Sequence, residues 1–211
     1  ASVAIGTNAL TNQNGGEYNL AIGMNSGTSV TSGDNNVFIG YQAGKETTSV
    51  NNNVAIGNYA LENSQTSENN VAIGYEALEI SNTGDGNTAI GYRAGNSCKG
   101  SSNIYLGNTS GVSNQNTGTG NILIGSSTDT ANTSDSYAIV LGHAGQTRGS
   151  NTVTIGAFKP AFGTDYGTTD TRIYGLRTAV TAITSDTTLT ANDSGETFVF
   201  NDAAATFTLP D

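Results

Sequence analysis

The chain has 211 residues, of which 35% are hydrophobic and 11% charged, and it carries 28 glycines, no tryptophan and a formal net charge of −10. This acidic balance argues against a nucleic-acid partner, because binding phosphates requires clustered Lys and Arg, and no apolar run approaches the roughly 18 residues of a membrane span. The abundance of Gly, Asn, Ser and Thr instead predicts many turns joined by short strands.

A repeat of about 17 residues occupies the chain from its start to residue 156. The segments NNVAIGNYAL (52 to 61) and NNVAIGYEAL (69 to 78) are nearly identical, and each contains a glycine after an aliphatic residue. Successive glycines of this kind are 17, 17, 17, 17, 17, 16, 18, 17 and 14 residues apart. They are Gly6, Gly23, Gly40, Gly57, Gly74, Gly91, Gly107, Gly125, Gly142 and Gly156. A fixed period over ten units predicts a solenoid, whose coils bury their apolar side chains by stacking on one another.

A three-residue strand is predicted directly before each glycine. Its third residue is Ile or Leu, as in Ile39, Ile56, Ile73 and Ile90, and its first is Val, Leu, Ile or, once, Thr88. Because this spacing of two places both side chains on one face of a strand, and stacked strands lie about 4.8 Å apart, we expect two aliphatic columns that form the core.

The middle residue of each strand is then expected to face away from the core. It is small and apolar in Ala4, Ala21, Ala55, Ala72 and Ala89, with Phe38, Tyr105 and Leu123 as exceptions. A face exposed to water would normally carry polar residues, and a coil of this length has few apolar residues with which to cover a second face. The alanines therefore predict a cover supplied by identical chains, arranged with closed cyclic symmetry.

An asparagine opens most of the predicted strands, four residues before the glycine. We interpret this position as a structural corner, where stacked amides hydrogen-bond from coil to coil, in preference to a ligand site. The asparagines of this ladder are Asn19, Asn36, Asn53, Asn70, Asn87, Asn103 and Asn121.

The recurring motif, seen as NNVAIGNYA, NNVAIGYEA and GNTAIGYRA, resembles the head repeats of trimeric autotransporter adhesins and the related repeats of bacteriophage tail fibres. The resemblance covers about residues 1 to 156 and implies a left-handed parallel β-roll, assembled as a homotrimer, that attaches to a host surface. The period of 17 is longer than the adhesin-head repeat, which leaves open whether the chain is a phage fibre or a bacterial adhesin.

Beyond residue 156 the repeat stops. Residues 157 to 182, which include Pro160, Arg172 and Arg177, are expected to form a neck, and residues 183 to 211 the incomplete beginning of a C-terminal β domain. The alternating residues and the NDSG turn of that last segment predict antiparallel strands. Since the chain also begins in mid-repeat without a signal-peptide-like leader, we expect it to be an excerpt of a longer protein.

Two columns of side chains are candidates for ligand binding. The position six residues before the glycine is acidic at Glu17, Asp34, Glu68 and Asp85, which allows calcium binding, although these residue types are also common in turns. No other cofactor is expected.

Three tyrosines, Tyr41, Tyr75 and Tyr92, directly follow the glycine. A row of rings can stack on sugars and recognise a glycan, or it can pack as an outer ladder that supports the roll; we favour packing.

The sequence offers little for catalysis. Cys98 lies in a Gly/Ser-rich segment and is interpreted as an incidental surface residue, while His143, the single histidine, occupies the position that carries Tyr in other coils. A hexapeptide acyltransferase would need aliphatic residues every six positions, and these are missing. Paired carboxylates for glycoside cleavage stay open, because 17 acids are present, but no pair stands out.

These features predict a non-enzymatic, extracellular fibre segment on a virion or a bacterial surface. Its expected partners are identical chains and a cell-surface glycan or protein, without nucleic acid or membrane insertion. The alternatives are a structural filament or sheath subunit that binds no receptor, and a fibre-borne enzyme that degrades glycans. An ice-binding solenoid is disfavoured because the repeats carry no Thr-x-Thr ladder.

Overall fold

The computed structural model describes residues 1–81, 84–112, 116–147 and 149–155, together with short strands in the region from 180 to 208. The chain divides into two compact units, Ala1–Thr169 and Asp170–Asp211. Gly156, Pro160, Arg172 and Arg177 lie outside the described residues, and so do most of the predicted neck and the NDSG turn.

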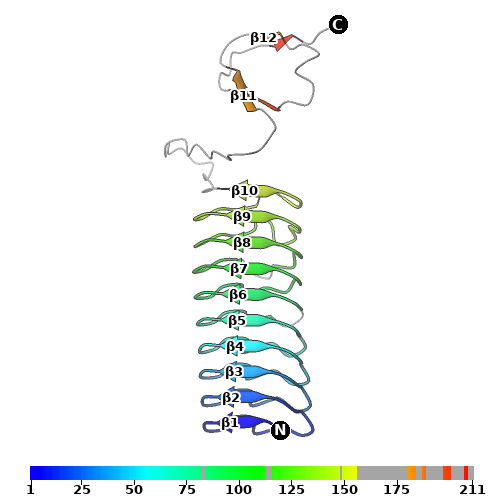
Figure 1. The fold of residues 1–211 in the computed structure, drawn as a ribbon, viewed down its shortest axis with the longest axis vertical. Coiled ribbons are helices and arrows are strands. Elements are labelled where there is room, and N and C mark those ends of the chain that lie inside the picture. The colour runs from blue at the N-terminus through cyan, green and yellow to red at the C-terminus, as the bar shows by residue number, and fades with distance from the viewer. Residues whose placement is uncertain are drawn as a thin grey trace. The chain divides into compact units, whose positions relative to one another are not determined.

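The described residues of the first unit form one sheet of ten parallel strands that pair in the order of the sequence (Figure 1). Each strand has three residues, and each lies directly before a repeat glycine. The strands are β1 (Val3–Ile5), β2 (Leu20–Ile22), β3 (Val37–Ile39), β4 (Val54–Ile56), β5 (Val71–Ile73), β6 (Thr88–Ile90), β7 (Ile104–Leu106), β8 (Ile122–Ile124), β9 (Ile139–Leu141) and β10 (Val153–Ile155). The predicted all-β parallel solenoid with coils of about 17 residues is therefore confirmed.

Each coil takes the number of the strand that opens it, and equivalent residues of successive coils lie in register. Ile39 pairs with Ile56, and Ile56 with Ile73. The glycine after the strand is required by close approach: Gly57 has a φ of +130°, and a Cβ atom there would lie 2.5 Å from the carbonyl oxygen of Gly74 in the next coil. A side chain at this position would thus separate the coils.

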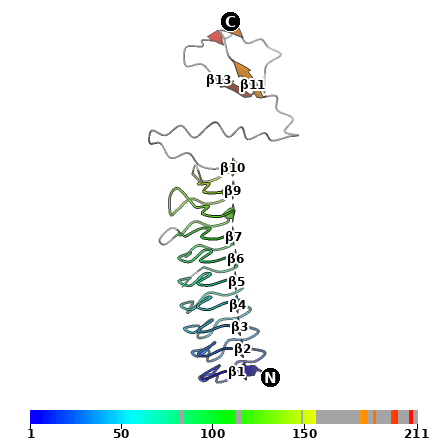
Figure 2. The ribbon, with the colours of Figure 1, turned by 90° about the vertical axis from the view of Figure 1, so that its left-hand side faces the viewer.

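The strand faces are the reverse of the predicted ones. The middle residues, including Ala21, Ala55, Ala72 and Ala89, are fully buried within this one chain, whereas the aliphatic first and third residues are half-buried or exposed. The prediction that the aliphatic columns form the core, and that the alanines need cover from another chain, is wrong. Figure 2 shows the strands in one row along one side of the stacked coils, so their outer surface is not covered by the chain's own turns.

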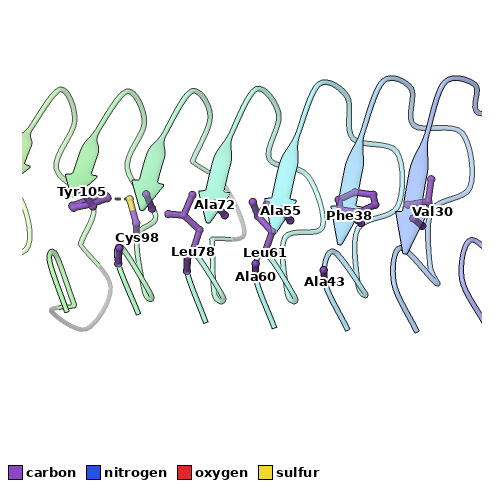
Figure 3. Packing of buried hydrophobic residues seen from close by; sticks show 14 of the residues in the cluster. Val30, Phe38, Ala43, Ala55, Ala60, Leu61, Ala72, Leu78, Cys98 and Tyr105 are labelled. Carbon is purple, nitrogen blue, oxygen red and sulfur yellow. Dashed lines mark hydrogen bonds between the residues drawn. The ribbon is translucent and has the colours of Figure 1, made fainter. Parts of the chain in front are cut away.

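The turn after each strand supplies the missing cover for the alanines. In coil 4 this turn places Ala60 and Leu61 in the same buried cluster as Ala55, and Ala77 and Leu78 do the same in coil 5 (Figure 3). The leucines adopt a left-handed backbone conformation, with a φ of +52° at Leu61. That conformation is unfavourable for a leucine, and burial of the side chain offsets its cost.

Where the middle residue of a strand is aromatic, the neighbouring turn positions of this core are small, and where the middle residue is alanine, at least one of them is leucine. Phe38 replaces the middle alanine of β3, and the turn positions on either side of it are Gly27 and Gly44 instead of leucine. A Cβ atom on Gly44 would lie 2.3 Å from the ring of Phe38. Each aromatic ring therefore fills the space that leucines fill in the alanine coils.

A second aromatic residue follows the same rule. Tyr105, in the middle of β7, lies against Gly95 and Gly111, where added Cβ atoms would approach the ring to 2.7 and 2.2 Å. Both large residues are fully buried.

The described residues of the second unit form two short pairs of strands. β11 (Val180–Ile183) pairs with β13 (Thr197–Phe200), and β12 (Thr187–Thr188) pairs with β14 (Phe207–Thr208). Both pairs are parallel, so the prediction of antiparallel strands is wrong. Alternation along a strand indicates which residues share a face, but it does not fix the direction of the partner strand.

Candidate functional site

One distinctive surface of the first unit is the outward face, which we define as the first and third residues of β1 to β10. Except at Thr88, these residues are Val, Ile or Leu. Even in the middle of the row, Ile104 and Leu106 expose 39% and 41% of their surface. Regular coil stacking joins these side chains into two columns, of which the column of third residues is aliphatic throughout and the column of first residues is interrupted only at Thr88. Contiguous apolar surfaces of this kind mark interaction sites.

A second distinctive surface is the tyrosine edge, a row formed by Tyr41, Tyr59, Tyr75 and Tyr92 in coils 3 to 6. Neighbouring ring centroids lie 5.3, 5.7 and 5.5 Å apart. The sequence repeat placed three of these residues in one column and left a gap at Asn58. Tyr59 fills that gap from the next residue, a signal that the position-by-position alignment missed.

Neighbouring rings of the tyrosine edge pack against one another along the row. Tyr75 and Tyr92 stack with an interplanar angle of 8°, while Tyr59 packs edge-on against both Tyr41 and Tyr75. The face of Tyr75 toward Tyr92 is therefore occupied, and the row offers ring edges and hydroxyl groups to a ligand more readily than open ring faces. This geometry favours the packing interpretation, while leaving hydrogen-bonding groups along the surface.

Charged side chains from the same turns surround the tyrosine edge. Lys45 Nζ lies 3.2 Å from Glu46 and 3.5 Å from Glu62, and Arg93 Nε lies 3.1 Å from Glu76. Ion pairs at the protein surface add little stability, but these pairs hold carboxylates close to the phenols.

Hydrogen bonding to Glu76, with a smaller contribution from burial, raises the pKa of Tyr75 to about 12. Burial also raises the pKa of Glu79, against the opposing effect of a 2.8 Å hydrogen bond from Asn96 Nδ2. Aromatic edges combined with carboxylates and amides can hydrogen-bond a hydroxyl-rich ligand.

The asparagine ladder lies inside the roll, with all seven side chains buried. Asn53 Oδ1 accepts a hydrogen bond from the backbone N–H of Asn70 at 2.9 Å, and Asn53 Nδ2 donates to the carbonyl of Ser67 at 2.9 Å. Most of these bonds join a side chain to the backbone, and direct amide-to-amide bonds occur at a few steps, as from Asn36 Nδ2 to Asn19 Oδ1. The residue in the left-handed conformation is the one before the ladder position, such as Asn52 with a φ of +60°.

The acidic column serves the backbone of the roll. Asp34 Oδ1 accepts from the backbone N–H of Glu17 at 2.7 Å, and Asp85 Oδ1 accepts from that of Glu68 at 2.8 Å. At the neutral step, Asn51 Nδ2 donates to Glu68 at 2.7 Å. Within the described residues, no three His, Cys, Asp or Glu side chains converge as a metal site requires.

Cys98 is fully buried, so the interpretation as a surface residue is wrong. Its sulfur accepts a hydrogen bond from the Tyr105 hydroxyl at 3.2 Å (dashed in Figure 3), and burial raises the pKa of the thiol. Small Gly and Ser neighbours, which suggested a surface loop, are instead what the narrow interior of a coil admits. His143 is exposed.

No protein-family model, curated protein or solved structure matches the chain. The resemblance to adhesin and tail-fibre repeats is therefore a prediction from the repeat motif. In the described part of the chain, no helix has the length and apolar character of a membrane span.

Proposed function

We propose that the chain is a non-enzymatic segment of an extracellular attachment fibre, and that it associates with identical copies through the outward face. The observation that supports this most directly is the row of aliphatic side chains repeated over β1 to β10. An apolar surface of this length is costly to leave in water. Identical chains carry identical surfaces, so a second copy is a natural occupant.

The assembly we propose is a homotrimer of left-handed rolls, as the resemblance to trimeric adhesin heads and tail fibres implies. Closed cyclic symmetry would bury the outward face of every copy in the same way. The corrected orientation changes the reason for assembly: the surface that needs cover is aliphatic and not alanine. We further propose that residues 183 to 211 begin a second β domain, and that the protein lies on a virion or a bacterial surface.

Attachment through a cell-surface glycan is the proposed use of the tyrosine edge. Four phenols lie in one row with carboxylates beside them, which offers both apolar edges and hydrogen bonds to sugar hydroxyls. The net charge of −10 favours a neutral receptor over an acidic one.

A structural filament or sheath subunit without a receptor is the second candidate. The observation that favours it is the stacking of Tyr75 on Tyr92, because rings that pack on each other can serve the roll alone. A glycan-degrading fibre enzyme is a weaker alternative, since it would need a pair of carboxylates in catalytic geometry.

A binding assay with matched variants separates these candidates. Asn58 and Asn108 occupy the position of Tyr75 and Tyr92 in other coils, so Tyr75→Asn with Tyr92→Asn should preserve the fold. Labelled protein is applied to a glycan array and to intact bacterial and animal cells. The attachment proposal predicts binding that this double variant loses.

The control for this assay is Met24→Asn, which introduces the same residue at the equivalent exposed position outside the row. It should bind like the unmodified chain. If the unmodified protein binds nothing, or if the double variant binds equally well, the tyrosine edge is not the receptor site.

A further inference from the structure

Among the described residues, three buried polar groups in coils 4 and 5 have no hydrogen-bond partner. They are Ser64 Oγ, Asn70 Nδ2 and Ser81 Oγ, and all three residues are fully buried. Buried groups of this kind are normally paired with protein or with an ordered water, because an unpaired one carries a desolvation penalty. We propose that these groups form a binding site for ordered water inside the roll. This proposal does not depend on the proposed function.

The three groups are neighbours because of the repeat. Ser64, Ser81 and Cys98 occupy equivalent positions, 17 residues apart. The sulfur of Cys98 lies 3.9 Å from Asn87 Oδ1 and 3.6 Å from Asn103 Nδ2, so this position is located between two successive members of the asparagine ladder.

The same relation places Asn70 between the two serines. By equivalence, Ser64 lies between Asn53 and Asn70, and Ser81 lies between Asn70 and Asn87. This equivalence makes Asn70 the ladder member that both serines share, and from it we infer that the three unpaired groups form one cluster.

The orientation of the Asn70 amide is fixed. Its Oδ1 accepts from the backbone N–H of Asn87 at 2.8 Å, so its NH2 group must be the unpaired end. The NH2 groups of Asn53 and Asn87 donate to carbonyls at 2.9 Å. Asn70 lacks such a bond and presents a donor to whatever occupies the cluster.

In other coils, the residue equivalent to Ser64 and Ser81 either has a hydrogen-bond partner within the protein or has no polar group. The sulfur of Cys98, in coil 6, accepts a hydrogen bond from the hydroxyl of Tyr105 in the middle of the next strand. For Ser64 and Ser81, the middle residue of the next strand is Ala72 and Ala89, respectively, and neither alanine carries a hydroxyl. In coil 3 the equivalent residue, Thr47, donates to the carbonyl of Gly44. In coil 2 the residue is Val30, which needs no partner.

The chemistry of the cluster selects water. Its occupant must accept a hydrogen bond from an amide and either donate to or accept from two hydroxyls, and a water molecule does both. An anion would accept these bonds but would need charge compensation, and Lys45 and Arg93 are already engaged with carboxylates at the surface. Water satisfies the three groups without burying a charge.

A high-resolution crystal structure of the assembled protein tests the proposal directly. The expected result is electron density for water within hydrogen-bond distance of Asn70 Nδ2 and at least one of the two serine hydroxyls. Crystals grown in bromide provide the comparison. An anomalous peak in the cluster would replace water by an anion, and rotation of the serines onto protein carbonyls without such density would remove the site; either result overturns the proposal.

Thermal unfolding of Ser64→Ala and Ser81→Ala gives an independent test through the sign of the change. If water pairs each hydroxyl, removal of that hydroxyl should lower the unfolding midpoint by about 2–4 °C, while Ser32→Ala, at an exposed serine, serves as the control. If the hydroxyls have no partner, their removal relieves a penalty. An unchanged or raised midpoint for both variants would therefore contradict the water site.

Discussion

Exchange of core residues between coils is the sharpest test of the internal packing. Phe38 is fully buried between Gly27 and Gly44, so Phe38→Ala should lower the free energy of unfolding by about 3–5 kcal/mol. Gly44→Leu should also destabilise the unmodified chain severely, because its Cβ atom would lie 2.3 Å from the ring of Phe38. Combined with Phe38→Ala, however, it recreates the arrangement of coil 4, where Ala55 packs with Leu61.

The backbone permits this rescue, since φ is +61° at Gly44 and +52° at Leu61. In a double-mutant cycle, Gly44→Leu should be much less harmful in the Phe38→Ala background, with a coupling free energy of roughly 1–3 kcal/mol. Urea unfolding followed by circular dichroism measures the four chains. Additive effects of the two substitutions would refute the claim that an aromatic ring in the strand and a leucine in the turn fill the same space in this core.

Three further predictions concern the polar interior and the tyrosine edge. Asn53→Ala should lower the free energy of unfolding by about 1–3 kcal/mol, because it leaves buried backbone groups unpaired. The control is Asn52→Gly, which keeps the left-handed backbone at an exposed position and should leave the free energy of unfolding nearly unchanged in the same urea titration. Cys98, being buried with a raised pKa, should react with a thiol reagent only at the rate of unfolding; rapid labelling of the folded protein would contradict its placement. Because the pKa of Tyr75 is raised to about 12 by Glu76, Tyr75→Phe should remove a component near pH 12 from the phenolate absorbance titration. Any stability from this hydrogen bond should be present below about pH 10 and lost as the pH rises through about 12.

The repeat in the sequence was sufficient to predict every strand of the roll, because the glycine spacing and the period-two aliphatic residues are both local signals. It could not determine which face is inside. Alternation over three residues is equally consistent with either orientation, and the choice depends on residues such as Leu61 and Leu78 that reach the core from the turns. Phe38 fills the space that leucine side chains fill in other coils, which shows that the interior of the roll is narrow. The core residues of one coil can therefore be predicted only together with those of its neighbours.

The tyrosine edge illustrates a similar limit. Alignment to the glycine brought Tyr75 and Tyr92 into one column, but it excluded Tyr59, whose position differs by one residue. The ring reaches the same row because the turn holds Tyr59 in the left-handed conformation, with a φ of +62°. Spacing in the sequence thus predicted the row, while the orientation of its rings required the backbone geometry of the turns.

Sedimentation equilibrium of the unmodified chain and of two variants tests the central claim, that the alanines form the core and the outward face joins identical copies. The unmodified protein should sediment above the monomer mass of 21.4 kDa, at three times that mass if the proposed trimer is correct. Ile56→Asp should give a folded monomer, because its carboxylate remains in water once the copies separate. Ala55→Asp should not fold, because its carboxylate would be buried without a partner. A stable folded monomer of the unmodified chain, or loss of folding with Ile56→Asp but not with Ala55→Asp, would contradict the account.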